Sequence, residues 1–106
     1  MPKEVGTSTE YDQLTQSGKV VVDFYAVWCG PCVAIAPYYV ELSSKYPGVT
    51  FLKVNVDSPG IKGAMALAKV RCMPTFVFYN NGAIVDRLEG ANQGALAQKI
   101  ASLSSK

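Results

Sequence analysis

The chain has 106 residues, of which 49% are hydrophobic and only 17% are charged. This length fits a single domain over residues 1–106, and the charged fraction lies below the roughly 25% of an average soluble domain. Such a composition excludes a disordered chain. The net charge is +2, and the basic residues are scattered rather than gathered in a stripe, so we expect no nucleic-acid partner.

Hydropathy also argues against a membrane protein or a secreted one. The longest nearly apolar stretch, Val20–Cys29, is interrupted by Asp23 and falls well short of the roughly 18 residues that span a bilayer. The stretch Met1–Glu10 is polar, whereas a secretory signal needs an apolar segment. We therefore expect a cytoplasmic protein with no membrane partner.

Strand patterns and helix patterns alternate along the chain. Apolar periodicity, capping residues and turn residues predict, in chain order, a strand near Lys3–Gly6, a short helix opened by the capping residues Thr7 and Ser8 and running to about Ser17, a strand over Lys19–Tyr25, a helix from Cys32 to about Tyr46, a strand over Val49–Asp57, a short helix over Ile61–Ala68, strands over Thr75–Tyr79 and Ala83–Leu88, and a last helix capped by Asn92. The turn Asn80-Asn81-Gly82 is a strong hairpin signal. This order predicts an α/β fold with a central mixed β-sheet, parallel in its early part, antiparallel at one edge, and covered by helices on both faces.

The sequence contains no histidine, which excludes Ser-His and Cys-His catalytic pairs. Its three cysteines, Cys29, Cys32 and Cys72, are too few for a disulfide-stapled secreted scaffold. Without histidine they are also too few for zinc, which takes about four ligands. We therefore expect no bound metal, and the chemistry must come from Cys, Asp, Lys or backbone groups.

Two of the cysteines lie where a buried strand is followed by a helix, in Trp28-Cys29-Gly30-Pro31-Cys32. Their spacing places both thiols on one face of the first helical turn, within reach of a disulfide. So short a ring constrains the unfolded chain less than a ring to Cys72 would. The pair therefore indicates redox cycling rather than a structural bridge, and the helix start favours the thiolate of Cys29.

Five segments together resemble the thioredoxin family, in order and in spacing. They are Asp23–Cys32, Pro37, Lys53–Asp57, Met73–Phe76, and Gly82 with Gly90-Ala91. The resemblance covers nearly the whole chain. It implies a thioredoxin fold and a general protein-disulfide reductase that acts by dithiol–disulfide exchange.

The resemblance also implies catalytic roles for individual residues. Cys29 matches the attacking cysteine and Cys32 the resolving cysteine, and the two form the redox-active disulfide. Asp23 matches the buried acid that takes the proton from the resolving thiol, and Lys53 matches the partner of that acid. An acid in an apolar strand has its pKa raised by loss of hydration, which suits a proton acceptor working near neutral pH.

Substrate binding is implied for residues around the cysteines. Pro74 matches a cis proline that faces the disulfide, and Met73 before it would offer backbone groups to an extended peptide. The other residues expected to bind substrate are Trp28, Gly30, Pro31, Gly90 and Ala91.

Plainer interpretations stay open for several of these residues. Trp28 is alternatively a core residue, Pro74 an ordinary loop proline, and Lys53 a solvated lysine at a strand edge. Val33 replaces the Lys or Arg that often follows the second cysteine in the family, so one charge that stabilises a thiolate is missing. Cys72 resembles an extra cysteine of some eukaryotic cytosolic members, and we expect it to be open to regulatory oxidation or a disulfide-linked dimer, the alternative being a packed thiol.

The family implies no bound cofactor. Electrons would come from NADPH through a flavoprotein, thioredoxin reductase, and the implied clients are ribonucleotide reductase, peroxiredoxin and methionine sulfoxide reductase. We expect a monomer. The alternative function is a binding module or chaperone adaptor with the same fold and a secondary redox activity. An adaptor has no need for a buried proton acceptor, so the presence of Asp23 beside the complete Cys29–Cys32 motif favours the reductase.

Overall fold

The computed structural model describes residues 1–68 and 74–106. Its strands are Lys3–Glu4 (β1), Lys19–Tyr25 (β2), Thr50–Asn55 (β3), Thr75–Asn80 (β4) and Ala83–Glu89 (β5). Its α-helices are Ser8–Thr15 (α1), Gly30–Lys45 (α2), Lys62–Ala68 (α3) and Gln93–Ser104 (α4), and a 3-10 turn, Pro59–Ile61 (η1), precedes α3. Within the described ranges, no helix is both long enough and apolar enough to cross a membrane.

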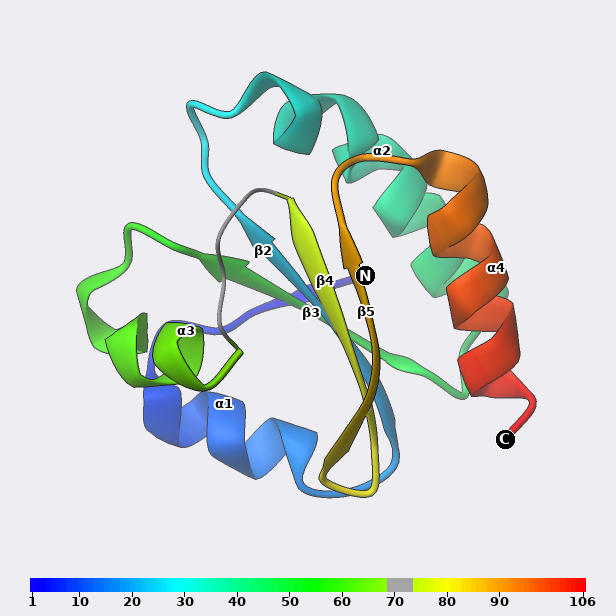
Figure 1. The fold of residues 1–106 in the computed structure, drawn as a ribbon, viewed down its shortest axis with the longest axis horizontal. Coiled ribbons are helices and arrows are strands. Elements are labelled where there is room, and N and C mark those ends of the chain that lie inside the picture. Colours follow the sequence, from blue (N-terminus) through cyan, green and yellow to red (C-terminus); the bar gives the residue numbers. More distant parts are fainter. Residues whose placement is uncertain (69–73) are drawn as a thin grey trace.

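The strands form one mixed sheet in the order β1-β3-β2-β4-β5 (Figure 1). β1 and β2 both run parallel to β3, whereas β4 runs antiparallel to β2 and to β5. The predicted mixed sheet with an antiparallel edge is confirmed. β2 lies at the centre of this sheet because its side chains are apolar on both faces, apart from Asp23, and need cover from both sides.

Helices cover both faces of the sheet, α1 and α3 on one and α2 and α4 on the other (Figure 1). Because side chains alternate along a strand, Val20, Val22 and Phe24 of β2 pack in the α1/α3 layer, and Val21 packs in the α2/α4 layer. The α2/α4 layer also contains Ile35, Tyr39 and Leu42 of α2 and Leu96, Ile100 and Leu103 of α4. Asp23 is therefore directed to the α2 side of the sheet.

The hairpin turn between β4 and β5 is formed by Asn81 and Gly82. Both residues have positive φ, 51° and 88°, as in the two-residue turns that match the twist of a hairpin. Gly18 donates its backbone N–H to Asn81 Oδ1 over 2.9 Å, and the Asn81 N–H donates to the Gly18 carbonyl over 2.9 Å. The hairpin is thus fastened to the loop that follows α1.

Three loops lie close together at one end of the neighbouring strands β2, β4 and β5. Phe24, near the end of β2, pairs with Thr75 at the start of β4, and Thr75 pairs with Glu89 at the end of β5. The loops that carry Cys29, Pro74 and Gly90 consequently leave the sheet at the same end of these strands. The two cysteines are found there.

Candidate active site

The two cysteines stand at the start of α2, one as its cap and one in its first turn. Cys29 is the N-cap, and its Sγ accepts a hydrogen bond from the backbone N–H of Cys32 over 3.3 Å. The helix begins at Gly30, not at Cys32 as the sequence predicted, because the Cys29 sulfur caps it and Pro31 fits its first turn. Both cysteines are buried, with exposed fractions of 8% for Cys29 and 3% for Cys32.

Asp23 is a buried acid on the sheet beneath this helix. It is 1% exposed, and its Oδ1 makes no hydrogen bond to any described residue. Burial raises its pKa to about 7, a rise that the charge of Lys53 opposes and that of Glu4 reinforces. The expectation of a carboxyl group with a raised pKa is met, and the dominant cause is loss of hydration.

Cys32 shares its surroundings with Asp23. Burial raises the pKa of the Cys32 thiol to about 12, and a hydrogen bond with Cys29 and the charges of Cys29 and Asp23 add to the rise, whereas a hydrogen bond with the Ala26 backbone opposes it. The Cys32 thiol is therefore protonated while Cys29 is reduced beside it. It needs a base before it can attack a disulfide.

A small cavity joins the two groups. It has a volume of about 180 Å³, and its lining includes Asp23, Cys32 and Lys53, together with Tyr25, Ala26, Val27, Val33 and Ala36. A water molecule occupies about 30 Å³ in the liquid, so the cavity has room for solvent between the carboxyl group and the thiol. The Asp23 carboxyl group and the Cys32 thiol therefore line one shared space.

Lys53 lies beside Asp23 in the sheet, and its ammonium group contacts the ring of Tyr25. The two residues are register partners on β3 and β2. Lys53 Nζ lies 4.5 Å from the centroid of the Tyr25 ring, a cation–π geometry. The Tyr25 hydroxyl in turn donates a hydrogen bond of 2.7 Å to Glu4 Oε1. Sequence reasoning gave no role to Tyr25 or Glu4, because their contact joins strands that are far apart in the chain.

Trp28 is 68% exposed, so the interpretation of Trp28 as a core residue is wrong. Its indole Nε1 donates a hydrogen bond to Asp57 Oδ2 over 2.8 Å, and Asp57 follows β3. Val27 and Val33 are also largely exposed and extend the apolar surface around the cysteines. Gly30 and Pro31 are exposed at the helix start. Asp57 ends the Lys53–Asp57 segment of the family resemblance, but no role was predicted for it.

The other predicted substrate-binding residues lie in the two neighbouring loops. Pro74 is buried, and its carbonyl accepts a hydrogen bond from the Gly90 N–H over 2.8 Å. Gly90 has a φ of 99°, which favours glycine, and Ala91 is exposed. Met73 and Cys72 lie outside the described residues, as does the peptide bond before Pro74, so their predicted roles stay predictions.

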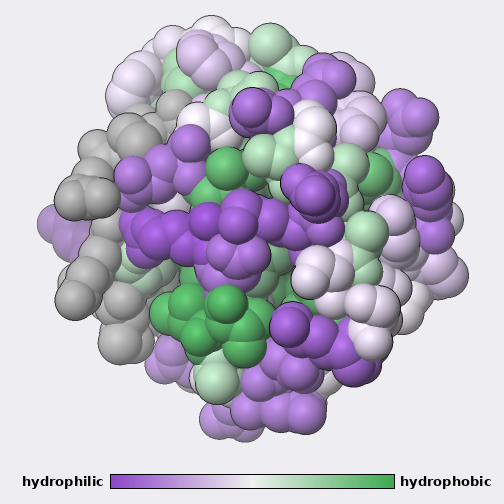
Figure 2. Space-filling view, turned by 45° about the vertical axis from the view of Figure 1, so that its right-hand side comes forward, coloured by the Kyte–Doolittle hydropathy of each residue, from purple (hydrophilic) through white to green (hydrophobic). Residues whose placement is uncertain are grey.

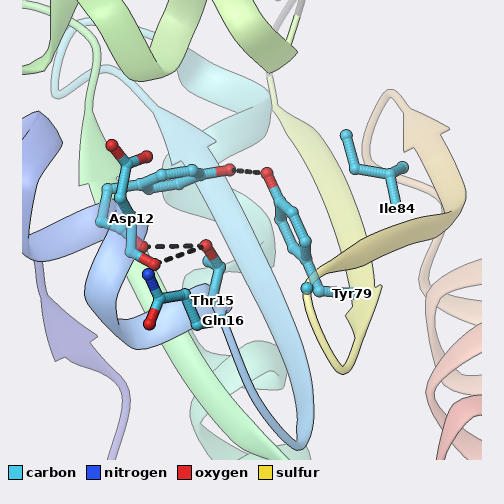
Figure 3. A pocket seen from close by; sticks show the side chains of 7 residues that line it. Asp12, Thr15, Gln16, Tyr79 and Ile84 are labelled. Atoms are coloured by element: carbon cyan, nitrogen blue, oxygen red, sulfur yellow. Dashed lines mark hydrogen bonds between the residues drawn. The ribbon is translucent and has the colours of Figure 1, made fainter.

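A larger cavity of about 620 Å³ lies away from the cysteines, between α1 and the β4–β5 hairpin (Figure 3). The Tyr11 and Tyr79 hydroxyls meet over it at 2.6 Å, and Asp12, Gln16 and Ile84 also line it. It contains neither a cysteine nor Asp23. In the described part of the chain, no three Cys, Asp or Glu side chains gather closely enough to hold a metal ion.

A pair of thiols at a helix start, with a buried acid on the same cavity as the second thiol, defines a thiol–disulfide oxidoreductase. Residues 3–102 match the family Thioredoxin. The chain belongs to the thioredoxin family, whose members are disulfide reductases. Its thioredoxin fold and its thiol–disulfide oxidoreductase activity, both expected from the sequence, are confirmed.

Relatives and solved structures support this assignment. The chain is 45% identical to thioredoxin 1 of Plasmodium falciparum over 101 residues, which are 94% of this chain and 95% of that protein. A solved structure of Plasmodium falciparum thioredoxin has a TM-score of 0.88 at 44% identity, covering 94% of this chain and 97% of the other. The thioredoxin-like protein 1 of Schizosaccharomyces pombe is 48% identical over 88% of this chain, which spans only 32% of that longer relative.

Proposed function

We propose that the chain, acting as a single domain, reduces client disulfides with Cys29 as the attacking thiol and Cys32 as the resolving thiol. The Cys29 thiolate attacks one sulfur of the client disulfide, and the other client sulfur leaves as a thiolate. Cys32 then loses its proton and attacks Cys29 Sγ. The Cys29–Cys32 disulfide forms, and the second client sulfur is released, so that two electrons have passed to the client.

The observation that carries the proposal is the cavity shared by Asp23 and Cys32. Two of the causes that raise the pKa of Cys32 are its hydrogen bond with Cys29 and the charge of Cys29. Both disappear when Cys29 Sγ is bound to a client sulfur. The pKa of Cys32 is then lower than in the reduced pair, while burial still keeps it raised, so the thiol needs a base, and the Asp23 carboxyl, whose pKa is about 7, lines the same cavity and can accept its proton.

For client binding we infer that the exposed surface of Trp28, Gly30 and Pro31 lies against the client, together with Gly90 and Ala91 across the sheet edge. Met73 and Pro74 would hold the client backbone in the manner of an added strand. The family implies a reductase and disulfide-containing clients as partners. We further propose thioredoxin reductase with NADPH as the electron source, peroxiredoxin, ribonucleotide reductase and methionine sulfoxide reductase as client classes, and the cytoplasm as the compartment.

Insulin reduction driven by NADPH and a thioredoxin reductase tests the proposal. The wild-type chain should give multiple turnovers, and Cys29→Ser should give none. Cys32→Ser should accumulate as a mixed disulfide with insulin, visible by mass spectrometry of the intact adduct, because the resolving thiol is missing. Sustained turnover by Cys29→Ser, or an adduct on Cys32 instead of Cys29, would reverse the assignment. A chain that binds clients but reduces none of them would favour the adaptor.

A further inference from the structure

A row of three charged residues crosses the sheet beside the active site. Glu4 on β1 is the register partner of Lys53 on β3, and Lys53 is the register partner of Asp23 on β2. Side chains at paired positions of a sheet point to the same face, so Lys53 stands between two acids. The position of its ammonium group therefore decides which carboxylate it stabilises more.

Tyr25 determines where this ammonium group lies. Its hydroxyl donates to Glu4 Oε1 over 2.7 Å, so its side chain extends from β2 across β3 to β1. Lys53 Nζ lies 4.5 Å from the centroid of the ring that is held in this way. Among the described residues, no ion pair within 4.0 Å joins Lys53 to Asp23. Lys53 therefore contacts the Tyr25 ring, although Asp23 is its register partner in the sheet.

We infer that Glu4 and Tyr25 are positioning residues for the resolving step: they hold the Lys53 ammonium on the Tyr25 ring and away from Asp23, which keeps Asp23 available as a proton acceptor near neutral pH. The inference rests on the role proposed above for Asp23. It assigns Glu4 and Tyr25 no contact with the client or with the reacting sulfurs.

The charges around Asp23 support this role. The titratable groups that act on it or face it in the described structure are Lys53 from β3, Glu4 from β1, Tyr25 from its own strand, and Cys32 and Tyr39 from α2. Lys53 is the one cation of this set. Because the attraction between opposite charges grows as they approach, a Lys53 released toward Asp23 would favour the ionised acid and weaken it as a base.

Three variants separate the parts of this arrangement. Tyr25→Leu removes both the ring and the hydroxyl, Tyr25→Phe keeps the ring and removes the donor, and Glu4→Gln keeps an acceptor for the hydroxyl. The midpoint of Asp23 titration, followed by the NMR shift of its carboxyl carbon in the reduced protein, should move to lower pH by about one unit in Tyr25→Leu. It should move less in Tyr25→Phe. The pH profile of client release from the Cys29 mixed disulfide should move in parallel.

The control is Tyr25→Leu made in a Lys53→Met background, which lacks the lysine charge. In Lys53→Met, the midpoint should start higher than in the wild type, and adding Tyr25→Leu should no longer lower it. This control distinguishes release of Lys53 from better hydration of Asp23, since hydration would act in either background. Thermal unfolding identifies a variant that is not folded, and Tyr25→Phe supplies the comparison if Tyr25→Leu is not.

Each outcome decides the inference. An unmoved midpoint in folded Tyr25→Leu, or a shift that persists beside Lys53→Met, would overturn the positioning role and leave the proposed reductase mechanism intact. A moved midpoint with an unmoved release profile would instead show that Asp23 is not the proton acceptor. That result would overturn the acid's role in the proposed function, and the positioning role with it.

Discussion

The indole of Trp28 donates a hydrogen bond to the carboxylate of Asp57 across 2.8 Å, joining the loop before the cysteines to the end of β3. Both residues are exposed, and the apolar ring of Trp28 is thereby held at the surface beside Cys29. The bond therefore orders a binding surface rather than the core. Figure 2 shows another face of the molecule, the one that carries β5 and α4, on which hydrophobic (green) and hydrophilic (purple) regions lie side by side.

We expect Asp57→Ala to lower the kcat/KM of client reduction by about three- to tenfold, because Trp28 loses the partner that fixes its ring. Asp57→Asn keeps an acceptor and should retain most of the activity. The unfolding free energy should change by less than about 1 kcal/mol, since the bond is exposed to water. Steady-state insulin reduction and urea unfolding of both variants measure these effects. Equal activity of Asp57→Ala and the wild type would show that Trp28 needs no support from Asp57.

The raised pKa of Asp23 makes stability depend on pH. The folded-state pKa is about 7 and the ordinary value is 3.8, so the folded protein binds the proton more tightly than the unfolded chain does. The stabilisation by the protonated acid is complete below pH 4 and is lost as pH rises through 7. The free energy of unfolding should therefore fall by a few kcal/mol over this range.

Asp23→Asn should remove that dependence. It should be more stable than the wild type at pH 8, and the advantage should shrink toward pH 4. The same variant should resolve mixed disulfides at least about tenfold more slowly at pH 7, because it cannot accept the Cys32 proton. Urea unfolding at several pH values and stopped-flow release of client give the two readouts. A wild-type stability that does not change between pH 4 and pH 8 would contradict the burial of an ionisable acid at this position.

The hairpin turn offers a test of backbone conformation. Gly82 has a φ of 88°, and a Cβ placed on it would lie 3.1 Å from the carbonyl oxygen of Gln16. Gly82→Ala should therefore cost about 1–2 kcal/mol of unfolding free energy. Asn81→Gly is the matched control at the neighbouring position of positive φ: it relieves the backbone and loses only the Oδ1 contact to Gly18, so it should cost less unfolding free energy than Gly82→Ala. A neutral Gly82→Ala would show that the turn can rearrange.

Tyr11 of α1 and Tyr79 of β4 share a buried hydrogen bond, so the losses of unfolding free energy in their single variants should not add up in the double variant. Tyr11 and Tyr79 share one hydrogen bond of 2.6 Å, and Tyr11 is only 1% exposed. Tyr79→Phe leaves the Tyr11 hydroxyl without this partner and should cost about 1–3 kcal/mol of unfolding free energy. Tyr11→Phe together with Tyr79→Phe should cost less than the two single changes added, since both polar groups are then gone. Thermal or urea unfolding of the three variants checks this, and strict additivity would mean that the two hydroxyls do not depend on each other.

Much of this protein was determined by local sequence. The Cys29–Cys32 spacing at a strand-to-helix junction, the alternation of strand and helix patterns and the Asn81-Gly82 turn each depend on residues that are close in the chain. Caps, turns and helix starts are determined by a few consecutive residues, so the fold class and the reactive pair could be predicted from the sequence. The start of α2 was misplaced because the sequence does not show that the Cys29 sulfur itself caps the helix.

The family resemblance already paired Lys53 with Asp23, but only the tertiary structure added Glu4 and Tyr25 to this pair. The strand order puts β3 between β1 and β2, which brings Glu4, Lys53 and Asp23 together and lets Tyr25 reach Glu4. A shift of register by one residue would turn every side chain of a strand to the other face of the sheet. Order and register are set by which apolar faces are buried together across the whole chain. The setting of Asp23 is therefore a property of the assembled sheet, whereas the cysteine pair is a property of the sequence.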